Sequence, residues 1–165
     1  MAIAKPDSEI LFRSWAQDQS IITDVVSTRI ATRLPSNATL PFAVFNIMAE
    51  VPENLNGAPI FIASFSIDCF AGKYGSDGNK GSADFAKAYE LGNAIVRCAF
   101  DFAPKKYSIT GTDGVIYGFD PIEGPYRLDD TESDLARYNV TIGMIYGAAE
   151  WRKLSWTLIS EILTL

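Results

Sequence analysis

The sequence contains no histidine among its 165 residues. Histidine is the commonest general base, the usual partner of a nucleophilic serine or cysteine, and the commonest zinc ligand. Most hydrolase mechanisms are therefore excluded. Acid–base catalysis by carboxylates would survive this loss, but it needs two carboxylates facing each other across a cleft, and a sequence does not show that geometry.

Cysteine is scarce as well, and long apolar runs are missing. Cys69 and Cys98 are the two cysteines, and their spacing is not that of a metal site. We expect two free thiols in a reducing compartment. No apolar run reaches the roughly 18 residues of a membrane helix. Residues Met1–Asp7 lack the apolar segment of a signal peptide.

Positive charge is also in deficit. Lysine and arginine number 14 against 20 acidic residues, which gives a formal net charge of −6. Binding to duplex nucleic acid needs clustered lysine and arginine to neutralise phosphates, so this balance argues against a duplex-binding face. The length suggests one domain, and an apolar fraction of 48% is ordinary for a globular protein.

The strongest pattern is an alternation of apolar and polar residues over Ser133–Gly147, which predicts a long strand with one buried face. Phe42–Val51 and Ile60–Phe70 are also predicted strands. Because a short loop joins them, they should pair as an antiparallel hairpin. Asp68 falls on the polar face of the second strand, where we expect a cross-strand lysine or arginine partner instead of a catalytic role.

Helical periodicity appears in three segments: Ser8–Gln17, Ile21–Thr28 and a longer one that starts at Ser82 and runs to about Phe102. The last has a wide apolar arc, which fits a helix lying across a sheet. Two shorter extended segments, Val115–Phe119 and Glu123–Leu128, flank a bend at Pro121.

These elements predict an α+β fold: a mainly antiparallel sheet of about four to five strands, with a long helix packed on one face and short helices at the N-terminus. Residues 1–147 are expected to form the single domain. Residues 148–165 would form a C-terminal amphipathic extension, helical or extended.

Two segments carry candidate interaction residues. The acidic cluster Asp129, Asp130, Glu132 and Asp134 is first of all expected to be a solvated turn, with a partner-facing patch or a metal site as alternatives. The glycine-rich segment 72–81 is predicted to be a loop, since it lacks the phosphate-binding pattern GxxxxGK[ST]. Its polar side chains are Lys73, Tyr74, Asp77 and Lys80.

The C-terminal extension has an apolar stripe at three- and four-residue steps, and two of the three tryptophans lie in it. It either packs on its own domain or docks on a neighbouring subunit, where tryptophan often dominates binding. The candidate contact residues are Trp151, Leu154, Trp156, Leu158 and Ile162.

The order of elements resembles the tail-completion, or tail-terminator, proteins of long-tailed (siphovirus- or myovirus-like) bacteriophages. The similarity covers roughly residues 8–147. It rests on Asp18-Gln19-Ser20-Ile21 leading to Arg29-Ile30, Leu40-Pro41-Phe42-Ala43-Val44-Phe45, Phe65-Ser66-Ile67-Asp68-Cys69-Phe70, the helix Phe85–Cys98 and the strand Arg137–Ile145. The long 72–81 loop and the segment beyond Gly147 depart from the family pattern.

The resemblance implies a virion protein of the tail neck region, assembled in the host cytoplasm as a hexameric ring. Such a ring ends polymerisation of the tail tube and joins the tail to the head connector, and genome DNA passes through it without specific binding. Its partners would be other copies of itself, the tail tube protein and the connector protein. No cofactor, metal or catalysis is implied. The acidic cluster and the 72–81 loop would face partners or the lumen.

Two alternatives stay open. One is another neck, connector or tube subunit of a phage, which would build open tubes in place of closed rings if it were a tube subunit. The other is a small ligand-binding protein or enzyme with a concave pocket and perturbed carboxylates.

Overall fold

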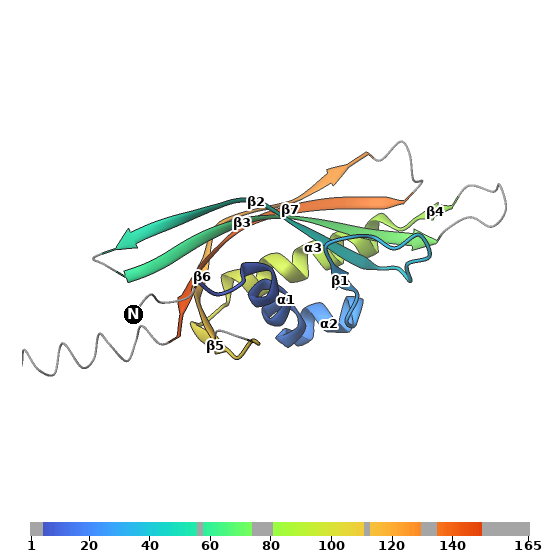
Figure 1. Ribbon diagram of the computed structural model, residues 1–165. Coiled ribbons are helices and arrows are strands. Elements are labelled where there is room, and N and C mark those ends of the chain that lie inside the picture. The colour runs from blue at the N-terminus through green and yellow to red at the C-terminus, as the bar shows by residue number, and fades with distance from the viewer. Residues whose placement is uncertain (1–4, 56–57, 74–80, 111–112, 130–134, 150–165) are drawn as a thin grey trace, which may run out of the picture.

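The computed structural model describes residues 5–55, 58–73, 81–110, 113–129 and 135–149 (Figure 1). The elements run α1 (Ser8–Asp18), α2 (Ser20–Val26), β1 (Ile30–Ala31), β2 (Phe42–Leu55), β3 (Ala58–Lys73), β4 (Ser82–Ala83), α3 (Phe85–Phe100), β5 (Lys105–Tyr107), β6 (Gly114–Leu128) and β7 (Ala136–Ala148). Within this part of the chain, no helix is long and apolar enough to cross a membrane.

The helices α1 and α3 begin at acidic caps. The Asp7 carboxylate accepts a hydrogen bond from the Ile10 backbone N–H at 3.0 Å, so Asp7 caps α1. The Asp84 carboxylate accepts one from the Lys87 backbone N–H at 2.9 Å and caps α3. Such a cap satisfies one of the free N–H groups of a first helical turn.

The strands form one sheet in the order β1-β2-β3-β7-β6-β5, and β4 pairs with the end of β3. All pairings are antiparallel except that of β1 with β2. The predicted hairpin is confirmed, with Phe42 opposite Phe70 and Leu55 opposite Ala58. The three helices lie against one face of the sheet, and the other face is open over most of its length (Figure 1).

The main core lies between the helices and that covered face. Phe12 of α1 stacks on Phe65 of β3 with ring centroids 4.5 Å apart, and it contacts Phe45 of β2 at 4.8 Å. The helix α3 crosses β3, β7 and β6, which confirms the expectation drawn from its wide apolar arc. It approaches β6 closely at Gly92, where an added Cβ would lie 2.8 Å from the Cβ of Pro125.

The predicted fold class is wrong. The described part of the chain is mostly sheet, with 49% strand and 27% helix, and its strands form a curled half-barrel flanked by three short helices. Three strands went unpredicted because β1, β4 and β5 have only two or three residues each. A period of two is not readable over so few residues, and their pairing comes from neighbouring strands.

The curl has a local cause in β-bulges, which bend a strand and increase its twist. The pairing of β2 with β3 shifts between Ile47 and Ala49. The pairing of β6 with β7 shifts at three places, between Ile116 and Tyr126. For this reason the two segments expected around Pro121 are in fact one strand, β6, whose alternation is broken by the bulges.

Element ends also differ from the prediction. The hairpin strands β2 and β3 extend several residues into the expected turn at 52–59. The helix α3 is shorter than expected at both ends, and Ser82 and Ala83 belong to β4. The long C-terminal strand is confirmed as β7, and it begins at Ala136.

Candidate functional site

The register of the sheet brings parts of both predicted interaction segments to the same end. Ala71 lies opposite Ala136, and Leu128 lies opposite Arg137. The end of β3, at Lys73, and the residue after β6, Asp129, therefore flank the start of β7. The other predicted residues of these segments, Tyr74, Asp77, Lys80, Asp130, Glu132 and Asp134, lie outside the described residues.

We call this end of the sheet, which carries Lys73 and Asp129, the charged end. Both of these side chains are accessible. Lys73 is exposed, and the side chain of Asp129 retains 84% of its accessible surface. The Arg127 Nε lies 3.3 Å from an Asp129 carboxylate oxygen. The Arg127 guanidinium group also stacks 3.9 Å from the centroid of the Phe85 ring. This cation–π contact joins the start of α3 to the end of β6.

A polar network occupies the open face of the sheet next to the charged end. The Asp68 carboxylate accepts hydrogen bonds from Arg137 Nη2 at 2.8 Å and from Asn139 Nδ2 at 2.9 Å. Asn139 Nδ2 also donates to the Ser66 hydroxyl at 2.8 Å. The prediction that Asp68 has a basic cross-strand partner is confirmed. The sequence did not identify Arg137 as that partner, because the register of β3 with β7 was unknown.

A second carboxylate, Glu50, is half-buried on the helix side of the sheet. It accepts hydrogen bonds from the Tyr146 hydroxyl and from Lys5 Nζ, beside a hollow of about 360 Å³ lined by residues of the α1 start and by Ile47. Burial raises the pKa of Glu50, but hydrogen bonds from Lys5, Tyr146 and Ser8 outweigh it, so the net pKa lies below the usual value. Burial and the Glu50 contact raise the pKa of Tyr146.

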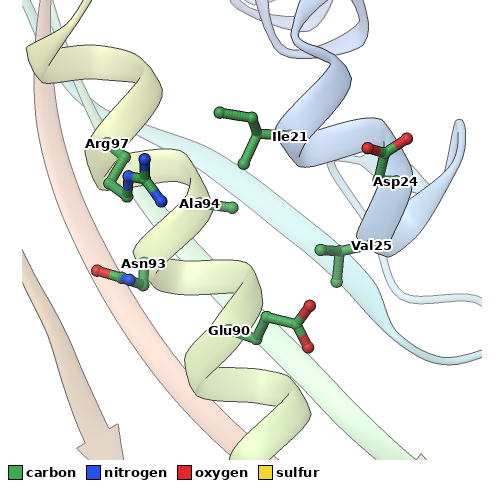
Figure 2. Close-up of a pocket in the computed structure, with 7 residues that line it drawn as sticks. All are labelled: Ile21, Asp24, Val25, Glu90, Asn93, Ala94 and Arg97. Carbon is green, nitrogen blue, oxygen red and sulfur yellow. The ribbon is translucent and has the colours of Figure 1, made fainter.

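A groove of about 300 Å³ runs between α2 and α3 (Figure 2). Its lining consists of Ile21, Asp24, Val25, Glu90, Asn93, Ala94 and Arg97. The floor is apolar, since Val25 and Ala94 are buried, while the charged side chains stand at the rim. The sequence did not indicate this groove, because it arises only when two helices predicted separately pack side by side.

The thiols and a metal site can be assessed for the described residues. Cys69 and Cys98 are free and buried, which confirms the expected pair of thiols. Burial raises the pKa of both. No group of three or more metal-ligating side chains occurs in the described ranges, but most of the acidic cluster lies outside them. The tail residues Trp151, Leu154, Trp156, Leu158 and Ile162 also lie outside.

Comparison with known proteins gives one line of evidence. No protein-family model matches the chain, and no curated protein matches it. Among solved structures, a chain of the "Virion of native gene transfer agent (GTA) particle" is similar, with a TM-score of 0.54 and 10% sequence identity. The match covers 81% of this chain and 90% of that chain. At this identity the likeness shows the fold alone: this half-barrel with three helices is the fold of a chain of that virion.

Proposed function

We propose that this protein is a structural component of a phage-like virion, and specifically the tail terminator. In this role it forms a ring at the head-proximal end of the tail, stops polymerisation of the tail tube and joins the tail to the head connector. The observation that carries the proposal is the fold likeness to a chain of a gene transfer agent virion, which extends over most of both chains. The order of elements, which resembles tail-terminator proteins, supports the finer assignment.

The two ends of the sheet support a role between two unlike partners. The charged end carries Lys73 and Asp129, on segments that we expect to face a partner or the lumen. The opposite end carries the β2–β3 turn and the end of β7, where Ala148 lies opposite Gly114. A protein that contacts a tube protein on one side and a connector on the other needs two separate surfaces, and the two ends of the sheet offer them.

Charge supports the passage of DNA. Six copies, each with a net charge of −6, give a ring of 6 × (−6) = −36. A negative ring repels the phosphates of a duplex, so the genome would pass without sticking. The network of Asp68, Arg137 and Asn139 is internally paired, so its one positive side chain is already neutralised.

The test is the solution mass of the purified chain by light scattering, with negative-stain images of the same peak. Closed rings with a mass of six times 18.1 kDa are expected. Open tubes would contradict termination and favour a tube subunit. A monomer or dimer that persists at every concentration would contradict self-assembly into a ring, and it would favour the ligand-binding alternative.

A further inference from the structure

The groove between α2 and α3 has a defined polarity. Glu90 and Arg97 both line it from α3, seven residues or about 10 Å apart along the helix axis (Figure 2). Asp24 lines it from α2. The acidic end of the groove therefore has one carboxylate on each wall, Glu90 and Asp24, and the other end has Arg97.

These rim charges are available to a ligand. In the described part of the chain, neither Asp24 nor Arg97 takes part in an ion pair or a side-chain hydrogen bond. Glu90 contacts Lys87 at 2.8 Å, but both side chains are exposed, and pairs of this kind contribute little. Ile21 retains 43% of its accessible surface beside the buried floor. The groove thus offers an apolar floor with an acidic end, where Asp24 has no ion pair among the described residues and Glu90 has an exposed one with Lys87, and an opposite end with Arg97.

One segment of the sequence has the complementary pattern. At about 100° per residue, Trp151, Leu154, Leu158 and Ile162 form one apolar stripe of a helix. Arg152 lies about 80° beyond one edge of that stripe and Lys153 about 100° beyond the other, at its N-terminal end, so their long side chains must reach around the helix to meet the rim of a groove that holds the stripe. Glu161 lies eight residues after Lys153, about 12 Å along a helix. The basic pair matches the acidic end of the groove, and Glu161 matches Arg97.

The direction of the chain decides which copy supplies this segment. Ala148 lies opposite Gly114, and Gly114 lies opposite Tyr107 of β5, which follows the C-terminal end of α3. The chain therefore leaves the sheet at the Arg97 end of α3 (Figure 1). If it entered its own groove from there, Arg152 and Lys153 would meet Arg97, and Glu161 would meet Glu90 and Asp24. Like charges would face each other at both ends.

We propose that residues 150–165 of one copy bind as an amphipathic helix in the α2–α3 groove of a second copy, parallel to α3. In this direction the charges of the tail are opposite in sign to those of the groove at both ends of the groove. The apolar stripe covers Ile21, Val25 and Ala94, and Trp151 supplies contact area of the kind that dominates interfaces. The inference extends the self-assembly put forward in the proposed function, since it names the contact between neighbouring copies.

Disulfide trapping on the full chain tests the contact directly. Parallel packing brings Ser155, three residues after Arg152, close to Asn93, three residues after Glu90. Chains with Asn93→Cys are mixed with chains carrying Ser155→Cys, oxidised and analysed on a non-reducing gel. We expect a product of twice 18.1 kDa. The matched control is Ser160→Cys, which lies on the side of the tail helix away from the stripe and should give at most about a tenth of that product.

Charge exchange gives the second arm of the experiment. Asp24→Lys with Glu90→Lys in the groove copy should lower the yield of cross-link at least about tenfold, because like charges then meet. Arg152→Glu with Lys153→Glu in the tail copy should restore it. Far-UV circular dichroism of each variant shows that it is folded.

Three results would overturn the inference: equal trapping of Ser155→Cys and Ser160→Cys, no rescue by the reversed tail, or a chain carrying both cysteines that forms its disulfide within one molecule. These outcomes are separable from the proposed function. Rings without trapping would refute the tail contact and leave the terminator assignment standing. Trapping without rings would support the tail contact and contradict the terminator assignment.

Discussion

Replacing Asp68 with alanine tests the polar network on the open face of the sheet. Asp68 is 9% exposed, and its carboxylate accepts from Arg137 at 2.8 Å and from Asn139 at 2.9 Å. In the described structure the Nε of Arg137 is buried without a hydrogen-bond partner. Asp68→Ala therefore removes the carboxylate that pairs with Arg137 among the described residues.

The expected loss lies between two limits. Breaking a fully buried ion pair costs about 3–5 kcal/mol, whereas a surface pair is worth about 0–1 kcal/mol. The Arg137 side chain is 33% exposed, so water can replace part of what the carboxylate provides. We expect Asp68→Ala to lower the free energy of unfolding by about 2 kcal/mol. The double variant Asp68→Ala with Arg137→Met should lose less unfolding free energy than the two single variants lose in sum. The difference should be about 1 kcal/mol or more.

Urea unfolding measured by circular dichroism, with tryptophan fluorescence, to which the buried Trp15 contributes, as a second probe, gives these free energies. The matched control is Lys87→Ala, which breaks an exposed pair of the same 2.8 Å length and should cost no more than about 0.5 kcal/mol. If Asp68→Ala costs no more than this control, or if the single changes are additive in the double variant, the network does not stabilise the sheet.

Three further outcomes are expected. Because hydrogen bonds hold the pKa of Glu50 below its ordinary value of 4.5, that carboxylate gives stability that is lost as pH falls through its folded pKa. Tyr146→Phe removes one donor, so acid unfolding followed by circular dichroism should begin at higher pH; an unchanged midpoint would contradict this. Cys69 and Cys98, buried and with raised pKa values, should react with a chromogenic thiol reagent only after unfolding. Gly92→Val should lower the free energy of unfolding, measured by urea titration, by about 1–3 kcal/mol, since the added Cβ would press on Pro125 of β6.

The elements predicted correctly are those whose pattern is local and long. The strand β7, the hairpin of β2 and β3, and the helix α3 each repeat their apolar period over many residues. Their pairing followed from short connections. Asp68 was interpreted correctly because a charged residue on the solvent side of a paired strand needs a partner across the sheet.

The errors arose where a long-range contact overrides the local pattern. Strict alternation places Glu50 on the same face as Val44, but the bulge next to Met48 turns it to the helix side, where it meets Tyr146. The curled sheet was underestimated because β1, β4 and β5 exist only through pairing with longer strands. The α2–α3 groove was missed because it depends on the packing of two helices.

A tail that binds in the groove of another copy makes a heterologous contact, since the surface it presents differs from the surface it occupies. A growing assembly then always keeps one free groove at one end and one free tail at the other, so growth stops only when the last tail reaches the first groove. Whether a ring closes depends on the rotation between copies, and a rotation that does not close gives an open filament. In a closed ring all copies point the same way, so the charged ends, with Lys73 and Asp129, would lie together on one rim. The groove contact alone would thus give the ring two unlike rims, which is the property that a protein between a tail tube and a head connector requires.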